Sequence, residues 1–297
     1  MNDTTAIALL ITLASALALN WGYLREHEAA NTLPPLSIGR PLHTAGLLLA
    51  SRRWLAGFAA EMAGWGLFVI ALALAPLALV QAVSAGGIGI LAALVSRLNP
   101  SRLSSGERIG VGLSIAGLAL LGASLAGGAG AGSKASWANL GLWFAASLAA
   151  ATVAIGPGRA LLGAGPAFGV ATGIAFAAGD IATKATVAGD PALVPVMIAG
   201  YGAGTMLLQM GFQRGGALAT AGLATLLTNA IPIAAGMTIF HEPLPGGVFG
   251  ALRVLAFATV IISALFLARR KVEDQQPTQA RPERAASVYR KKGYEGV

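Results

Sequence analysis

The stretch from Trp54 to Leu74, WLAGFAAEMAGWGLFVIALAL, decides the fold of this chain. It is about as long as the ~20-residue helix that crosses ~30 Å of hydrocarbon. Arg52 and Arg53 precede it, and Glu61 is the one charged residue within it. Comparable apolar runs recur from one end of the chain to the other. The sequence therefore predicts a multi-span helical membrane protein.

The composition agrees with this reading. Of the 297 residues, 56% are hydrophobic and 11% are charged, whereas a soluble domain carries about 25% charged residues. The chain has no Cys, which excludes disulfides and thiolate metal sites. The first apolar segment, residues 5–23, lacks a basic n-region and a small-residue cleavage site, so we expect it to be a retained helix.

We predict an all-α polytopic bundle of about nine transmembrane helices, or ten if residues 31–51 supply another. Within that segment, Ala45 to Ala50 is apolar but too short to cross a bilayer. It is therefore either an interfacial helix or the stub of a tenth span. The nine predicted spans are approximately residues 5–23, 54–74, 76–97, 109–127, 137–156, 166–187, 191–211, 216–240 and 248–267.

The basic residues give this threading an orientation. Seventeen of the 20 Lys and Arg residues fall on one side: Arg25, Arg40, Arg52, Arg53, Arg97, Arg102, Arg108, Arg159, Arg214, Arg269, Arg270, Lys271, Arg281, Arg284, Arg290, Lys291 and Lys292. Cytoplasmic loops are rich in Lys and Arg, so we predict an outside N-terminus and a cytoplasmic C-terminus in the cytoplasmic membrane. The same rule explains the net charge of +8 without a nucleic-acid partner.

The predicted domain organisation is a transmembrane domain over residues 1–270, followed by a basic cytoplasmic tail over residues 271–297. The tail is polar and nearly free of apolar runs, so we expect it to be disordered. We divide the transmembrane domain into a first half, about 1–130, and a second half, about 131–270.

Two blocks of sequence suggest that these halves are inverted repeats. Residues 75–108 and 216–244 each hold a helix rich in small residues, then a short loop with one acidic residue, before a closing helix. Glu107 falls on the inner side of the membrane in our threading, and Glu242 falls on the outer side. Inverted repeats are a recurrent architecture of secondary transporters, with the substrate path between the halves.

The chain also resembles the drug/metabolite transporter superfamily over residues ~1–270. The residues that carry the resemblance to its NIPA-like branch are Arg53 to Gly57, Glu61, Gly64 and Ala73 to Val80; those that resemble its EamA-like branch are Asn229 to Pro232 and His241 to Leu244. Where the NIPA-like run continues with Pro and then Gly, this chain has Ala82 and Ser84. The resemblance implies secondary transport of a small solute, with magnesium transport as the alternative that the NIPA-like branch implies.

Charged residues inside the predicted spans are functional candidates, because they cost about 2.5–3.5 kcal/mol on insertion scales. Glu61 is either a proton- or cation-binding carboxylate or a carboxylate bonded to a neighbouring helix. Asp180 and Lys184 lie one turn apart and can form an ion pair, which we favour over a direct role in solute binding. Arg253 can bind an anionic group or pair with Glu242 or Asp180.

Uncharged polar residues complete the set of candidates for substrate or ion binding. Gln81 lies in the third predicted span. Asn229 precedes Pro232 by one turn, and because a proline removes a helix hydrogen bond, nearby carbonyls can line a cavity. We expect a cavity that touches both Glu61 and Asn229. The alternative for each polar residue is a hydrogen bond between helices.

Small residues recur along two predicted spans at one-turn spacing. One series is Gly165, Gly169 and Gly173; the other is Gly110, Ser114 and Gly117. Small residues at such spacings let helices approach closely. We expect them to pack within the monomer, with a homodimer face as the alternative.

Motifs of enzymes are lacking. The three histidines, His27, His43 and His241, lie outside the predicted spans, so no Ser–His pair is available within the membrane. We expect no enzymatic activity and no cofactor, and the sequence does not define a metal site. The expected partners are membrane lipid and a small-molecule or ion substrate. The remaining alternative is a membrane scaffold that transports nothing.

Overall fold

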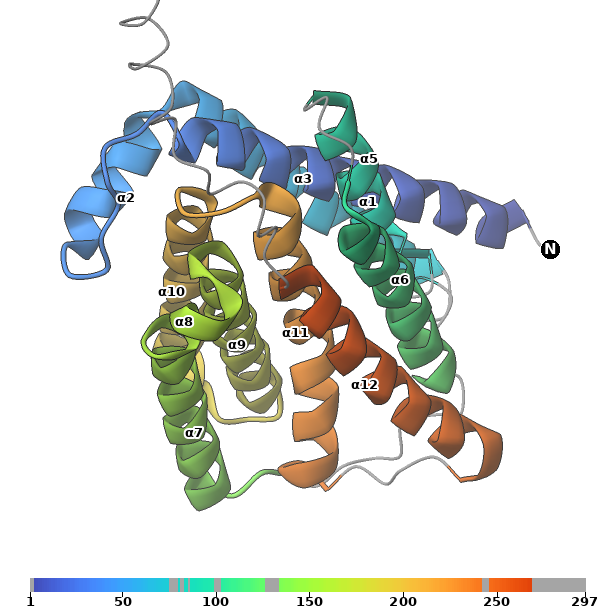
Figure 1. Ribbon diagram of the computed structural model, residues 1–297. Coiled ribbons are helices and arrows are strands. Elements are labelled where there is room, and N and C mark those ends of the chain that lie inside the picture. Colours follow the sequence, from blue (N-terminus) through green and yellow to red (C-terminus); the bar gives the residue numbers. More distant parts are fainter. Residues whose placement is uncertain are drawn as a thin grey trace, which may run out of the picture.

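The computed structural model describes residues 3–74, 80, 83–84, 86–98, 103–125, 134–241 and 246–268. These residues form α-helices and short connections (Figure 1). The helices are α1 (Asp3–Ala30), α2 (Pro41–Ala50), α3 (Arg52–Leu74), α5 (Gly87–Leu98), α6 (Ser105–Leu125), α7 (Trp137–Ile155), α8 (Gly158–Leu162), α9 (Ala164–Val187), α10 (Val194–Phe212), α11 (Ala217–Thr238) and α12 (Gly247–Ala268), with a 3-10 turn, η1 (Pro191–Leu193), before α10. The all-α prediction is confirmed for this part of the chain.

Eight of the described helices are long and apolar enough to cross a membrane: α1, α3, α6, α7, α9, α10 with η1, α11 and α12. The protein is thus a multi-pass membrane protein, but the nine spans that we predicted are not all present in the described residues. The ninth, 76–97, lies partly outside the described residues: within it the structure describes helical residues 80 and 83–84 and the 12-residue α5, so a ninth crossing there stays a prediction.

Residues 31–51 contain a short helix rather than a tenth span in the structure. α2 has 10 residues and begins at Pro41, whose fixed φ suits the first helical position. Gln213 holds the segment before α2: its Nε2 donates to the carbonyls of Ala30, Leu33 and Pro34, and its Oε1 accepts from the Leu36 amide. The segment is therefore fixed to the connection between α10 and α11.

Helix α9 is central to one group of helices, in which it packs against α7, α10 and α11. Its small residues explain the contact with α11. A Cβ on Gly169 would lie 2.5 Å from the Thr220 carbonyl oxygen, and one on Gly173 would lie 2.9 Å from that of Ala224. This confirms that the small-residue series of α9 packs within the monomer.

A second close pair joins α6 to α12 (Figure 1). A Cβ on Gly110 would lie 3.0 Å from Leu267, and one on Gly117 would lie 3.1 Å from Val260. The Ser114 and Ser263 hydroxyls lie 2.6 Å apart. The series on α6 therefore also packs within the chain, and it joins the predicted first half to the last helix of the second half.

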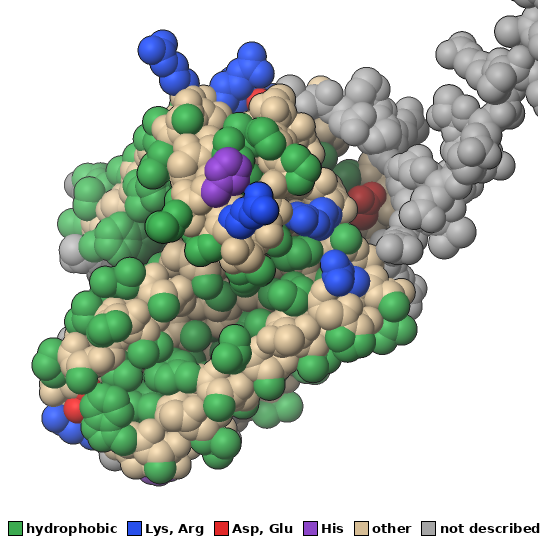
Figure 2. All heavy atoms as spheres, turned by 90° about the vertical axis from the view of Figure 1, so that its left-hand side faces the viewer, with side chains coloured by type: hydrophobic (Ala, Val, Ile, Leu, Met, Phe, Trp, Pro, Cys, Tyr) green, Lys and Arg blue, Asp and Glu red, His purple; other side chains and the backbone are tan. Residues whose placement is uncertain are grey.

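Basic residues gather at one end of the bundle. Arg214 donates to the Leu36 carbonyl, and the pKa of Arg214 is lowered by partial burial and by the positive charge of nearby Arg159. Figure 2 shows Lys and Arg side chains clustered at the upper end of one face, above a broad hydrophobic surface. At the opposite end, a Cβ on Gly189 would lie 3.0 Å from Lys134 Nζ. The connections at 31–40 and 213–216 thus share one end, and those at 134–136 and 188–190 share the other.

Glu107 has a local structural role that our repeat prediction did not include. Its carboxylate accepts from the Ser104 amide at 2.7 Å, and the Ser104 hydroxyl accepts from the Glu107 amide at 3.2 Å. This reciprocal pair is the capping box of α6. Glu242 and the tail over 271–297 lie outside the described residues.

Candidate functional site

The interface between α1 and α3 positions Glu61. Three glycines bring the two backbones close together: a Cβ on Gly22 would lie 2.8 Å from the Gly57 carbonyl oxygen, and one on Gly64 would lie 2.9 Å from the Leu19 amide nitrogen. The Ser15 hydroxyl also donates to the Gly64 carbonyl across the same interface. Such close approach requires residues without side chains.

Glu26 faces α3 one turn beyond Gly22, and it lies beside Glu61. A Cβ on Gly57 would lie 2.9 Å from Glu26 Cγ, and the Glu61 backbone nitrogen is within 3.0 Å of the corresponding position at Gly22. The two carboxyl groups are close enough for one to hydrogen bond to the other when a proton is present. Two carboxyls from neighbouring helices thus form a pair.

Gln209 of α10 completes this cluster. Its Nε2 donates to Glu26 Oε2 at 2.5 Å, and both side chains are fully buried. Glu26 Oε1 and Gln209 Oε1 are buried without a hydrogen-bond partner among the described residues. An unpartnered buried polar oxygen is costly, so both oxygens can gain from a proton or a cation in this cluster.

Tyr23 lies near the carboxyl pair, and the histidine that follows Glu26 contacts a neighbouring helix. Tyr23 lies near enough to Glu26 and Glu61 to interact with the charge of both. His27, the next residue after Glu26, has Nε2 3.2 Å from the Gly215 carbonyl oxygen and its ring edge-on to Phe212. The end of α1 is therefore fastened to α10 and to the connection that follows it.

The arrangement can bind a proton or a small cation. Glu26 is buried, whereas Glu61 is partly exposed, so Glu61 is the member that an incoming ion reaches more easily. A single proton held between two carboxyls removes one of two repelling charges from a region of low dielectric constant. Gln209 connects the carboxyl pair, with or without a bound proton or cation, to the group of helices around α9.

The other predicted site residues do not join this cluster. The Asp180 carboxylate accepts a hydrogen bond from the Tyr201 hydroxyl at 2.7 Å, and the ion pair with Lys184 that we favoured stays a prediction. Lys184 Nζ lies 4.4 Å from the centre of the Phe240 ring. Both contacts are at the predicted outer end of α9.

Arg253 hydrogen bonds to a neighbouring helix, and Asn229 hydrogen bonds within its own helix. Arg253 is buried, and its guanidinium donates to the Ser124 hydroxyl and carbonyl of α6. Asn229 Nδ2 donates to the Thr225 carbonyl in the preceding turn of α11. Gln81 lies outside the described residues. The expected cavity touching Glu61 and Asn229 stays a prediction, because neither residue lines the described pocket.

Glu26 and Gln209 are the site residues that our sequence analysis did not identify as such. We ended the first span at Tyr23, which assigned Glu26 to a loop, whereas α1 continues to Ala30. The signal was the spacing of Ser15, Gly22 and Glu26, which places all three on one helical face. Gln209 is a single polar residue within the predicted span 191–211, and its neighbours in the sequence do not distinguish it as a site residue.

No family model, no curated protein and no solved structure matches this chain. A proposal about its function therefore rests on the geometry of the site.

Proposed function

We propose that this protein is a secondary transporter that moves a small solute across the cytoplasmic membrane by alternating access, coupled to protons at Glu26 and Glu61. The observation that carries the proposal is the carboxyl pair, because buried ionisable groups in a membrane protein mark ion pathways and proton relays. Eight apolar helices supply the membrane scaffold. The predicted orientation places the N-terminus outside and the basic end in the cytoplasm.

The contacts suggest how proton binding is coupled to movement. α1 and α3 form one close unit, whereas Gln209 belongs to α10, which packs on α9. When the pair loses its proton, the charge of Glu26 strengthens the hydrogen bond from Gln209. When the pair is protonated, this hydrogen bond weakens. Loss of the proton therefore holds the α1–α3 unit and the α9–α11 group together more tightly, and binding of the proton loosens their contact.

The remaining predicted residues have supporting roles in this proposal. Asn229 and Asp180 line the solute path on α11 and α9, and Gln81 contributes a polar group from the predicted third span. Lys184 and Arg253 supply basic side chains beside the solute path. The two halves, about 1–130 and 131–270, act as the inverted repeats around the path.

The test is a ligand screen followed by a flux measurement. Thermal shift of the purified protein against metabolites and amphipathic cations identifies a ligand, because a ligand that binds the folded state raises the melting temperature. Uptake of that ligand into liposomes is then driven by an imposed pH gradient. We expect Glu61→Gln and Glu26→Gln to abolish the dependence of uptake on the pH gradient. Glu28→Gln, which lies on the same helix as Glu26 but at its surface, should keep this dependence.

Proton coupling through this pair is refuted if Glu61→Gln transports with the unchanged pH dependence of the parent protein. If neither the screen nor the flux assay detects a solute, the result instead favours the scaffold alternative.

A divalent cation is the second candidate ligand. The unpartnered oxygens of Glu26 and Gln209 favour it, because hard cations bind carboxylate and amide oxygens. No group of three or more His, Asp or Glu residues that could hold a metal occurs in the described part of the chain, so we rank magnesium second. Magnesium flux at equal pH on both sides of the membrane, lost in Glu26→Gln, is the outcome that would select it.

A further inference from the structure

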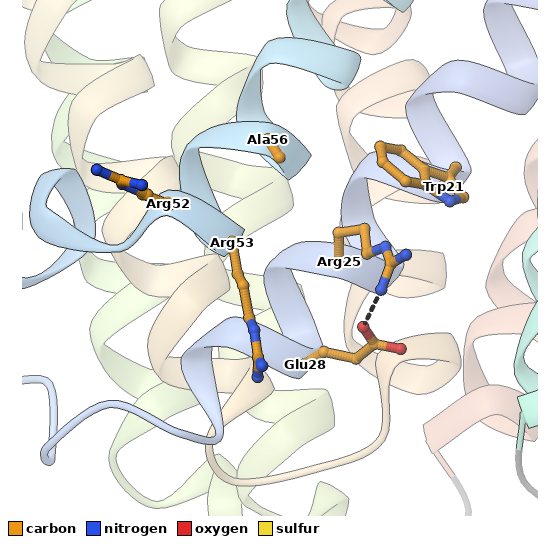
Figure 3. Close-up of a pocket in the computed structure, with 6 residues that line it drawn as sticks. All are labelled: Trp21, Arg25, Glu28, Arg52, Arg53 and Ala56. Atoms are coloured by element: carbon orange, nitrogen blue, oxygen red, sulfur yellow. Dashed lines mark hydrogen bonds and ion pairs between the residues drawn. The ribbon is translucent and has the colours of Figure 1, made fainter.

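A separate pocket lies between the basic ends of α1 and α3. It has a volume of about 560 Å³ and is lined by Trp21, Arg25, Glu28, Arg52, Arg53 and Ala56. Figure 3 shows Trp21 and Arg25 extending from α1, with Arg53 reaching from the start of α3 toward Glu28. The carboxyl pair described above is not part of this lining, so the pocket is a second site.

The charges of this pocket favour an anion. Arg25 is already partnered, since it forms an ion pair with Glu28 at 2.9 Å and lies over the Trp21 ring. The side chains of Arg52 and Arg53 make no hydrogen bond or ion pair with any described residue. Two guanidinium groups are thus available, and their forked donors match the oxygens of a phosphate group.

An apolar lane on α1 leads directly to these charges. Leu10, Leu13, Leu17 and Trp21 are exposed, and their spacing of three or four residues places them on one face of the helix. Arg25 and Glu28 continue the same spacing. α1 has 28 residues and is about 42 Å long, which is longer than a ~30 Å hydrocarbon core, so a helix of this length can adjoin hydrocarbon with its apolar face and polar headgroups with its charged end.

We propose that this pocket binds the phosphate group of an anionic phospholipid, with one acyl chain along the lane from Trp21 to Leu10. A charged pocket alone suits any phosphate. The adjoining exposed lane favours a lipid, because it offers an acyl chain an apolar surface next to the charged pocket. Trp21 lies between the apolar and the charged residues, as aromatic side chains do where proteins meet the membrane boundary.

Native mass spectrometry of the full-length protein tests the proposal. The protein is exchanged into detergent with phosphatidylglycerol or with phosphatidylcholine, and the bound lipid is quantified. We expect preferential retention of phosphatidylglycerol. An arginine that contacts an anionic headgroup contributes an affinity factor of about five, so Arg53→Gln weakens retention about five-fold and Arg52→Gln with Arg53→Gln weakens it about 25-fold.

Arg40→Gln is the matched control, because Arg40 is an exposed arginine in the same connecting region but outside the pocket. Arg25 is left intact, since its loss would leave Glu28 unpaired. The melting temperature of each variant without added lipid establishes that it is folded. An Arg52→Lys and Arg53→Lys variant keeps the charge but removes the forked donors, and we expect intermediate retention.

Two further measurements separate the possible results. Inorganic phosphate and glycerol phosphate are added at millimolar concentration; if either displaces the lipid or raises the melting temperature through Arg52 and Arg53, the ligand is a free phosphate and the lipid assignment is wrong. Equal retention of phosphatidylcholine, or equal loss in Arg40→Gln, also overturns it. The glutamine variants Glu26→Gln and Glu61→Gln are expected to retain the lipid, so this proposal and the transport proposal fail independently.

Discussion

At the scale of single residues, polar side chains in this protein have roles that depend on local geometry. Glu107 and Glu61 are both acidic residues of helices with an apolar sequence, but Glu107 caps its helix and Glu61 faces a second carboxyl. The difference follows from position: Glu107 is three residues after a serine at a helix start, and Glu61 is in the middle of a helix.

The capping box at the start of α6 gives a prediction for one hydroxyl. Ser104→Ala removes the acceptor for the Glu107 amide, so we expect the free energy of unfolding to fall by about 1 kcal/mol, the usual cost of losing such a cap. The measurement is thermal unfolding in detergent. Ser105→Ala is the control, because among the described residues the Ser105 hydroxyl bonds only the exposed Arg108 side chain; an equal loss in both variants would count against the cap.

Sequence reasoning identified Glu61 because a lone carboxylate inside an apolar run stands out. It did not identify Glu26, because the cluster His27, Glu28 and Arg25 around it resembles the end of a span. Only the packing of α1 on α3 shows that the last turns of α1 are buried on one face and exposed on the other. Partners such as Tyr201 for Asp180 lie on other helices, and no spacing along one helix reveals them.

At the scale of elements, the closest helix pairs depend on glycines, because the two backbones approach so closely that a side chain would not fit between them. Spacing along the sequence was sufficient to predict the small-residue faces of α6 and α9. It could not show which helix each face meets, because many helices offer complementary surfaces of similar size. The pairing of α6 with α12 is therefore a result of the structure alone.

The α1–α3 interface can be tested with two glycines of α3. A Cβ on Gly64 would lie 2.7 Å from Leu19 Cγ and 2.9 Å from the Leu19 amide nitrogen, whereas a Cβ on Gly66 would meet nothing within 4 Å. We expect Gly64→Ala to lower the free energy of unfolding by about 1–3 kcal/mol through overpacking. Gly66→Ala should be neutral or stabilising by about 0.5–1 kcal/mol, since alanine favours a helix. Urea or thermal unfolding in detergent measures both, and similar effects in both variants would contradict the described interface.

At the scale of the whole molecule, the apolar runs and the basic loops predicted a multi-pass bundle with two chemically different ends. The structure adds that 31–40 and 213–216 meet at one end through Gln213 and Arg214. The number of spans was less predictable. A run such as 76–97 has the composition of a span, but composition does not specify where a helix begins or ends within it.

The orientation is directly testable because the chain contains no Cys, so a single introduced Cys is labelled without background. Ile38 and Ala188 are exposed at opposite ends of the bundle. We expect a membrane-impermeant maleimide to label Ala188→Cys in intact cells and Ile38→Cys only after permeabilisation. The reverse pattern would place the N-terminus inside, and labelling of both from one side would contradict the arrangement of the ends.

The pairing of α6 with α12 also has a consequence for biosynthesis. α12 ends at Ala268, so it is the last described helix to emerge from the ribosome, long after α6 has entered the membrane. Until then, Gly110, Ser114 and Gly117 face lipid or a temporary neighbour. A nascent chain arrested before Gly247 therefore exposes a helix-binding face that the folded protein conceals, so the synthesis of α12 is the step that covers this face of α6.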